Sequence, residues 1–193
     1  MKKSKIPIEI SARHIHLSAS DLLTLFGADF NLEKLRELSQ PGEFLSRERL
    51  TLKTEKGKIE HVAVLGPLRE KTQIEISLTD AKKLGLNPPV RSSGNLVGSV
   101  GCVLSSDKGT LELREGVIVA RRHLHLNLTQ AQKLGVKDGD SVSVEIKNCF
   151  RPVIFKDVLV RVGENYNLTM HVDTDEGNAA GLTPDSYGEI VNL

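Results

Sequence analysis

Two short segments of the sequence each carry a pair of histidines separated by one residue. SARHIHLS spans residues 11–18, and ARRHLHLN spans residues 120–127. In a β-strand, residues two positions apart face the same side with Cα atoms about 6.5 to 7 Å apart, so both imidazoles of a pair can reach one metal ion. Each His-x-His pair therefore predicts a two-ligand clamp for a transition metal.

Four segments share a pattern that predicts a short helix. Each begins with a polar cap residue, has an acidic or amide side chain three positions later, and ends in glycine, which favours the left-handed turn that closes a helix. The caps, third-position residues and glycines are Ser18, Asp21 and Gly27; Ser77, Asp80 and Gly85; Asn127, Gln130 and Gly135; and Asp173, Glu176 and Gly181. We interpret these segments as one strand–helix unit that is used four times.

Alignment of the four caps brings the residues with metal-ligand chemistry into two positions. Two residues before the caps stand His16, Glu75, His125 and His171, and four residues before them stand His14, Gln73, His123 and Thr169. The five histidines and Glu75 exceed the four ligands of one tetrahedral ion, so we predict two metal ions bridged by a carboxylate. Imidazole-rich ligation favours Zn²⁺, and Co²⁺, Mn²⁺ and Fe²⁺ are compatible with it. His61 lies outside the pattern and is expected to be an ordinary side chain.

Arg69 is the cation best placed for binding an anion near such a site. It lies in LGPLREKTQIEIS, residues 65–77, in the loop that enters the Glu75 strand. A planar guanidinium can bind an anion through two parallel hydrogen bonds, so the pattern indicates phosphate chemistry. By contrast, Arg13, Arg121 and Arg122 adjoin the histidines and are expected at the surface or between domains.

Composition excludes several classes of function. The 193-residue chain has a formal net charge of +1, with 26 basic and 25 acidic residues spread along its length, and it lacks Trp. Neither a polycationic segment nor an aromatic platform for nucleic acid is therefore expected. There is no apolar run for a signal peptide or a bilayer span, so we predict a soluble cytoplasmic protein with no membrane partner. Cys102 and Cys149 are isolated, and we expect two reduced thiols.

Short strand-like runs dominate the chain and predict a mostly β protein with short helices. These runs are IPIEIS (6–11), RLTLKT (49–54), IEHVAVLG (59–66), QIEIS (73–77), LELREGVIVA (111–120), DSVSVEI (140–146), PVIFKDVLVRV (152–162) and NLTMHVDT (167–174). We predict two β-barrel domains with a dimetal site between them. The segment LNPPVRSSGNLVG (86–98) is expected to join residues 1–90 to residues 91–193, with the terminal strands free to cross over.

Six longer segments resemble the PduL-type phosphate propanoyltransferases, in the same order and over nearly the whole chain. They are IPIEISARHIHLS, LSQPGEF, LGPLREKTQIEIS, KLGLNPPVRSSGNLVGS, EGVIVARRHLHL and MHVDTDEGNAAG. The resemblance implies two β-barrel domains with short helices. It also implies a metal-dependent phosphotransacylase, which interconverts an acyl-CoA and phosphate with an acyl phosphate and CoA.

The resemblance also implies roles for individual residues. It places one zinc on His14 and His16 and the other on His123, His125 and His171, with Glu75 shared or adjacent. Phosphate is placed on Arg69, so Arg69 and Glu75 are the expected catalytic residues. Coenzyme A is placed near Ile8, with contacts around Lys56, Ala63 and Asn178. Phosphate held by metal and Arg69 would attack the acyl carbon directly, while zinc polarises the carbonyl oxygen or stabilises the departing thiolate.

Two other functions are compatible with the same residues. A metal-dependent acyl-CoA hydrolase would use water in place of phosphate, and a non-catalytic binding module would use the histidines for structural zinc. Ligand sets without cysteine, next to an anion-binding arginine, favour an open catalytic site. The sequence leaves open the choice between acetyl and propanoyl groups. Only seven residues precede Ile8, so we expect no encapsulation extension for a microcompartment. A homodimer is expected from the frequency of such assemblies.

Overall fold

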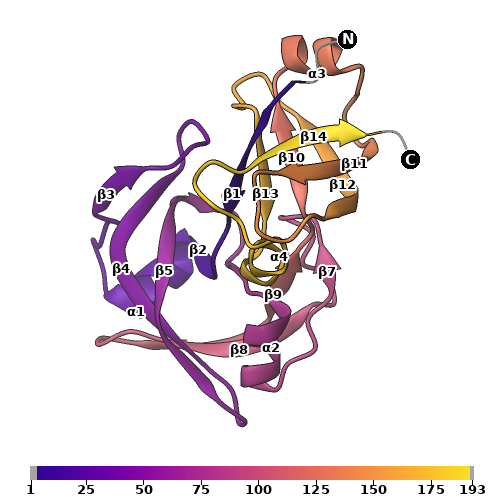
Figure 1. Cartoon of the computed structure of the whole chain (residues 1–193). Coiled ribbons are helices and arrows are strands. Elements are labelled where there is room, and N and C mark those ends of the chain that lie inside the picture. The colour runs from indigo at the N-terminus through magenta and orange to yellow at the C-terminus, as the bar shows by residue number, and fades with distance from the viewer. Residues whose placement is uncertain (1–3, 192–193) are drawn as a thin grey trace. The chain divides into compact units, whose positions relative to one another are not determined.

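The computed structural model describes residues 4–191, which divide into two compact units (Figure 1). Unit 1 comprises the described parts of Met1–Ser11 and Arg121–Leu193 together with Ser39–Pro41. Unit 2 comprises Ala12–Leu38 and Gly42–Ala120. Each unit has its own core of buried aliphatic side chains.

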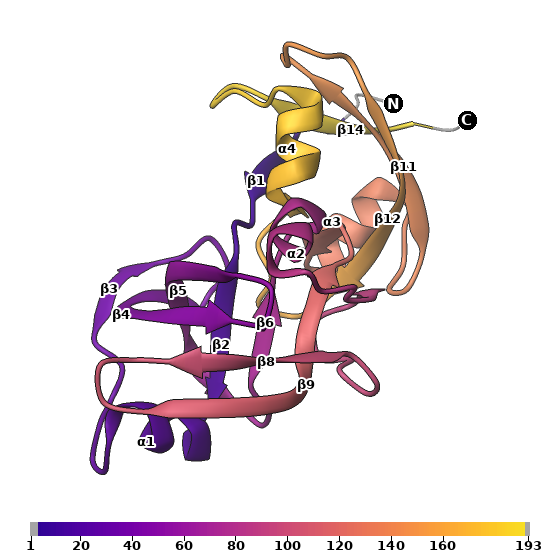
Figure 2. The same ribbon diagram turned by 90° about the horizontal axis from the view of Figure 1, so that it is seen from below.

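Unit 2 is a barrel in which six strands pair in a closed ring. The ring runs β4–β5–β2–β6–β9–β8 and returns to β4, while β3 pairs with β4 and β7 with β9. Figure 2 shows β8 and β9 side by side. The elements are β2 (His14–Ser18), α1 (Ala19–Phe26), β3 (Lys34–Glu37), β4 (Phe44–Lys53), β5 (Lys58–Arg69), β6 (Gln73–Glu75), α2 (Leu78–Leu84), β7 (Val90–Arg91), β8 (Val100–Ser105) and β9 (Thr110–Ala120).

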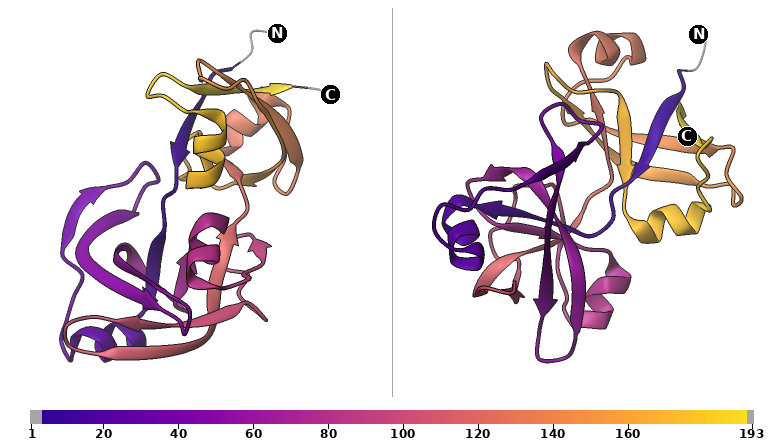
Figure 3. Two further views of the ribbon diagram at one scale, coloured as in Figure 1. Left: turned by 60° about the horizontal axis from the view of Figure 1, so that its bottom comes forward. Right: turned by 90° about the vertical axis from the view of Figure 1, so that its left-hand side faces the viewer.

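Unit 1 is a second closed barrel, with the strand order β1–β13–β10–β12–β11–β14. Its first strand comes from the N-terminal end of the chain and pairs in parallel with β13 and antiparallel with β14. In Figure 3 this strand is the indigo one among the orange and yellow strands of the barrel. The elements are β1 (Ile6–Ile10), β10 (His123–Leu126), α3 (Leu128–Leu134), β11 (Ser141–Lys147), β12 (Ile154–Val162), β13 (Thr169–Val172), α4 (Thr174–Ala180) and β14 (Tyr187–Val191).

The prediction of a mostly β protein with short helices and two β-barrels is therefore confirmed. The two barrels also use one strand arrangement, because the His-x-His strand lies between a parallel and an antiparallel neighbour in each. In unit 2 these neighbours of β2 are β5 and β6, and in unit 1 the neighbours of β10 are β12 and β13. Successive side chains of a strand point to opposite faces, so Ile15 and Leu124 pack into the barrel cores while the histidines on either side of them lie on the outer faces of the barrels.

All four predicted helices begin at the predicted caps, whose side chains accept the backbone N–H three residues later. The reciprocal bond of a full capping box is formed only in α3 and α4. In α1 and α2 the third-position carboxylates of Asp21 and Asp80 instead accept hydrogen bonds from Thr72 and Arg13. Gly27 also differs from the expected left-handed turn, because its φ of 97° is combined with an extended ψ of 171°. All the helices in the described residues are too short to cross a membrane.

The expected boundary at residues 90 and 91 differs from the division in the structure. Residues 91–120 belong to unit 2, because β8 pairs with β4 and β9 pairs with β6. The segment 86–98 lies inside this unit and contains β7. Its Pro, Gly and Ser residues form a loop that hydrogen bonds to β5 and β6 of its own barrel. Local composition signals such a loop, but it does not show which strands the loop joins.

Candidate metal and phosphate site

The outer face of the unit 1 barrel carries a cluster of three histidines on two adjacent strands. His123 and His125 belong to β10, and His171 on β13 is the cross-strand partner of His123. One ring nitrogen of each lies within 4.8 Å of those of the other two. The ring centroids are 4.6 to 5.1 Å apart. Within residues 4–191, this is the only group of three or more potential metal ligands with donor atoms so close together.

The protonation pattern of this cluster fits a bound cation. Nδ1 of His123 lies 2.9 Å from the carbonyl oxygen of Arg121, and a carbonyl only accepts, so in the neutral imidazole Nε2 carries the lone pair that can bind a metal ion. The His125 side chain is buried, stacks on Tyr166, and has no hydrogen-bond partner at either ring nitrogen. Burial, with the nearby His123, His171 and Arg161, lowers the pKa of His125 to about 2, so its ring is neutral at pH 7. A buried imidazole without partners is a costly arrangement that a metal ion would relieve.

Unit 2 presents a second set of potential ligands at the corresponding positions. His14 pairs in register with Glu75, and His16 pairs with Gln73. Nε2 of His14 lies 3.5 Å from Oε2 of Glu75, and its Nδ1 lies 2.8 Å from the carbonyl oxygen of Ala12. In both pairs, the Nδ1 atom of the first histidine thus lies close to the carbonyl oxygen of the residue two positions before it.

His16 completes the unit 2 set. It is 2% exposed, and its Nδ1 has no hydrogen-bond partner. Burial, followed by the effects of His14 and Arg69, lowers the pKa of His16 to about 2. Two imidazoles and a carboxylate fit Zn²⁺ by donor type.

Arg69, at the end of β5, is held by two neighbours in unit 2. Its Nη1 donates to Oγ of Ser93 at 2.7 Å, and its Nη2 lies 3.6 Å from Oε1 of Glu43. The Arg69 side chain is 30% exposed, and its planar guanidinium is a group that binds oxyanions. Arg69 is paired in register with Ser18, two residues beyond His16. The structure therefore places the predicted phosphate-binding residue on the strand beside the His14 and His16 strand.

Gln73 connects Ser93, which accepts a hydrogen bond from Arg69, to the Glu75 carboxylate. Its Nε2 donates to Oε1 of Glu75 at 2.6 Å and to Oγ of Ser93 at 2.7 Å, and its Oε1 accepts the N–H of Gly94 at 2.6 Å. No sequence pattern predicted a role for Ser93 or Glu43, and Gln73 was identified only by its position four residues before a helix cap. The SSG run of residues 92–94 indicates a tight turn, but the partners of that turn depend on the fold.

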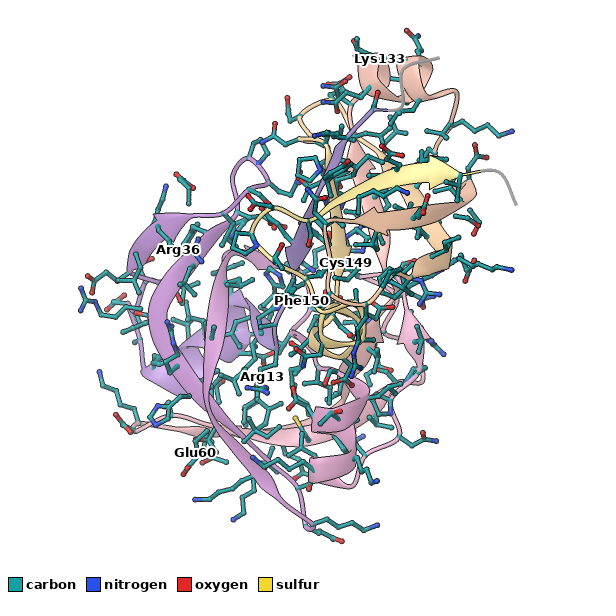
Figure 4. All side chains as sticks on the ribbon, viewed as in Figure 1. Arg13, Arg36, Glu60, Lys133, Cys149 and Phe150 are labelled. Atoms are coloured by element: carbon teal, nitrogen blue, oxygen red, sulfur yellow. The ribbon has the colours of Figure 1, made fainter. Side chains whose placement is uncertain are left out.

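The three arginines that adjoin the histidine pairs form ion pairs within their own units. Arg13, labelled in Figure 4, binds both carboxylate oxygens of Asp80 at 2.6 and 2.9 Å. Arg122 donates to Glu176 at 2.7 Å, and Arg121 pairs with Asp157. Through these contacts the three side chains stabilise helices and strands near the histidines.

The residues expected to contact coenzyme A fall in both units. Ile8 lies on β1, and the exposed Asn178 lies in α4, both in unit 1. Ala63 on β5 is the register partner of His14. Lys56 occupies the turn between β4 and β5, packs against Gly85, and lines a cavity of about 600 Å³ with residues of α2, β8 and β9. Of the two unit 2 residues, only Ala63 is in register with a predicted ligand.

The chain matches the model of one protein family, described as phosphate propanoyltransferase, over residues 7–183. A phosphate propanoyltransferase of Thermotoga maritima is 49% identical over 192 residues, covering 100% of this chain and 91% of that protein. One of Alkaliphilus metalliredigens is 46% identical over 97% of this chain and 88% of that protein. One of Shewanella putrefaciens is 47% identical over 94% and 86%, respectively. With two barrels, a His-x-His strand in each, and this similarity along its length, the chain belongs to the phosphate propanoyltransferase family of acyltransferases.

Proposed function

We propose that this protein is a phosphotransacylase that interconverts propanoyl-CoA or acetyl-CoA and phosphate with the acyl phosphate and CoA. The observation that carries this proposal is the family match over residues 7–183, which includes both histidine sets, Glu75 and Arg69. A hydrolase would need only water as the second substrate. A guanidinium held by Ser93 on the strand beside the His14 and His16 strand favours phosphate instead.

The residues that would hold metal ions follow from the two ligand sets. His123, His125 and His171 would hold one ion, and His14, His16 and Glu75 the other, with Zn²⁺ the expected metal. When bound, these ions would supply positive charge that balances the phosphate and the charge developing on the thioester. The backbone carbonyls of Ala12 and Arg121 orient the first histidine of each pair.

The chain's own groups would bind and orient phosphate for direct attack. Arg69 is permanently charged and would bind two phosphate oxygens, while Ser93 and Glu43 hold its guanidinium in place. A phosphate oxygen would form a bond to the acyl carbon as the carbon–sulfur bond breaks, and the electron pair would leave with the CoA sulfur. Phosphate is already an anion, so this step requires no protein nucleophile. Consistently, burial raises the pKa of Cys102 to about 12, which keeps its thiol protonated.

The coenzyme A contacts are assigned to individual residues of the chain. We assign contacts to Ile8, Lys56, Ala63 and Asn178, as the family resemblance implies. Ala63 has support from its register with His14. Lys56 has support from the cavity beside its side chain.

The proposal is tested by measuring CoA release from propanoyl-CoA by zinc-loaded protein, with and without phosphate. We expect release that requires phosphate, yields propanoyl phosphate stoichiometrically, and falls at least about 100-fold in the His123→Ala, His125→Ala variant. Removal of metal with a chelator should abolish the activity, and added Zn²⁺ should restore it.

His61→Asn is the matched control, because His61 is exposed and outside both clusters, and asparagine tolerates its φ of 57°. Its rate should equal that of the unaltered protein. Equal CoA release without phosphate would identify a thioesterase. Absence of release from folded, zinc-loaded protein with several acyl-CoA substrates would overturn the enzymatic assignment.

A further inference from the structure

Glu9 on β1 places a carboxylate beside the unit 1 histidine cluster. Its Oε2 lies 3.4 Å from Nε2 of His171. The hydroxyl of Ser39 donates to the same carboxylate oxygen at 2.6 Å. Ser39 belongs to the short segment 39–41 of unit 1, where Gln40 also hydrogen bonds twice to the backbone of Asn167. The position of the Glu9 carboxylate is thus supported by a segment that is itself fixed to the barrel.

Strand register puts Glu9 in one row with two of the histidines. Glu9 is the partner of His171 across β1 and β13, and His171 is the partner of His123 across β13 and β10. The neighbouring row of Ile8, Met170 and Leu124 packs into the barrel core. Because successive residues of a strand alternate between faces, the row of Glu9, His171 and His123 shares the outer face.

Comparison of the two barrels shows what is particular about this position. In each barrel the His-x-His strand pairs with an antiparallel neighbour, and that neighbour pairs in turn with a third strand. The third strand is β9 in unit 2 and β1 in unit 1. On these strands, the partner of Glu75 is the buried Ile118, whereas the partner of His171 is Glu9. Histidine therefore replaces glutamate on one strand, and glutamate replaces isoleucine on the next. Each barrel consequently has one carboxylate among its outward-facing donors.

We propose that the Glu9 carboxylate is the fourth protein ligand of the cation held by His123, His125 and His171 in the absence of substrate. The inference rests on the part of the proposed function that gives this cluster a metal ion. Imidazole ligands carry no charge when bound to a metal, so three of them leave the full double charge of a divalent ion without compensation, and one carboxylate halves that charge. The 48% exposed Glu9 side chain has room to withdraw when a substrate binds.

The test measures metal binding by the full chain, without phosphate or CoA. Zinc affinity is determined by chelator competition, and ligand geometry by the visible absorption of the Co²⁺-loaded protein. The His123→Ala, His125→Ala variant identifies the binding step that belongs to this cluster. Glu9→Gln should weaken that step at least about tenfold and alter its Co²⁺ spectrum, without changing any other step.

Glu164→Gln is the matched control, since Glu164 is an exposed carboxylate in the same unit, and it should bind metal as the unaltered protein does. Ser39→Ala retains the Glu9 charge and removes only its hydroxyl donor, so it should weaken the same step to a smaller extent. Thermal unfolding of the metal-free variants checks that they fold alike. Equal affinity and spectrum for Glu9→Gln and Glu164→Gln would overturn the inference, as would a wild-type protein without a metal step at the cluster.

The two proposals fail separately. A protein whose Glu9→Gln variant loses metal affinity, but whose wild type makes no acyl phosphate, refutes the phosphotransacylase assignment and retains Glu9 as a ligand. A wild type that makes acyl phosphate, with unchanged metal binding in Glu9→Gln, refutes only the role of Glu9.

Discussion

At the scale of single residues, hydrogen-bond chemistry determines how Arg69 is presented to an anion. Oγ of Ser93 accepts from both Nη1 of Arg69 and Nε2 of Gln73. The orientation of the Gln73 amide follows from its other contacts, because its Nε2 faces the Glu75 carboxylate and its Oε1 faces the Gly94 N–H. A metal-ligand candidate and a phosphate-ligand candidate are thereby connected through one amide and one hydroxyl.

Replacement of Ser93 by alanine should loosen Arg69 without removing its charge. Loss of one such hydrogen bond costs about 1 kcal/mol, which corresponds to a rise of about fivefold in the KM for phosphate. The KM for acyl-CoA should change much less. Steady-state kinetics with each substrate varied in turn measures the difference. Ser92→Ala is the control, and equal phosphate KM values for the two variants would contradict this role for Ser93.

At the scale of elements, an equivalent arginine–carboxylate pair supports the His-x-His strand in each barrel. Arg13 immediately precedes His14 and binds Asp80 in the first turn of α2, the helix after β6. Arg122 immediately precedes His123 and binds Glu176 in the first turn of α4, the helix after β13. In each unit, the arginine before the histidine pair thus connects the His-x-His strand to a helix. That helix is the one that follows the antiparallel neighbour of this strand.

Arg13→Ala should destabilise unit 2, because it leaves the Asp80 carboxylate, with a 7% exposed side chain, without its bidentate partner. Since Arg13 is itself 42% exposed, solvent screens the pair and the expected loss is about 1 to 2 kcal/mol. Urea unfolding measures this change. In a double-mutant cycle, Asp80→Asn should recover part of the loss.

Arg47→Ala serves as the comparison, since the Arg47–Glu33 pair is exposed on both sides. It should change the free energy of unfolding by no more than about 1 kcal/mol. Equal losses in Arg13→Ala and Arg47→Ala would show that the Arg13–Asp80 pair contributes no more than a surface contact.

At the scale of the whole molecule, the two cores contain one thiol each. Cys102 packs in the unit 2 core, and Cys149 lies partly buried against the unit 1 core. Neither forms a disulfide, as the sequence predicted. Because the two thiols belong to different units, their reactivities report separately on the opening of each barrel.

Cys102 should react with a thiol reagent only when unit 2 unfolds. Burial raises its pKa to about 12, so almost no thiolate is present at pH 8 even apart from the steric protection. Cys149 should react in the folded protein. Labelling over time at pH 8, with mass spectrometry of the peptides, measures both rates, and Cys149→Ser isolates the slow one. Rapid labelling of Cys102 in folded protein would contradict its place in the core.

Local patterns were sufficient to predict the helix caps, the strands that carry the histidines, and the fold class. Cap positions and strand alternation depend on residues close together in the sequence, so His14, His16, His123, His125 and His171 could all be found. The position of Glu9 beside His171 could not be predicted, because no helix follows its strand, which leaves Glu9 outside the cap alignment. Its neighbour His171 is distant in sequence, and the parallel pairing of β1 with β13 has no local signal.

The domain boundary was misplaced for a related reason. Turn-like composition in residues 86–98 resembles that of a linker, but the long pairing of β9 with β8 keeps residues 100–120 in unit 2. The strands β3, β7, β8 and β14 were not among the predicted runs, and in the structure each is defined by its pairing with other strands.

The position of β1 between β13 and β14 has a consequence for the order of assembly during synthesis. A ribosome completes the strands of unit 2 by residue 120, whereas β1, made first, has to wait for β13 and β14 at the far end of the chain. Until then the nascent chain presents β1 without its partners, an exposed edge of the kind that promotes aggregation. The set of His14, His16 and Glu75 is therefore complete on a growing chain that does not yet contain His171.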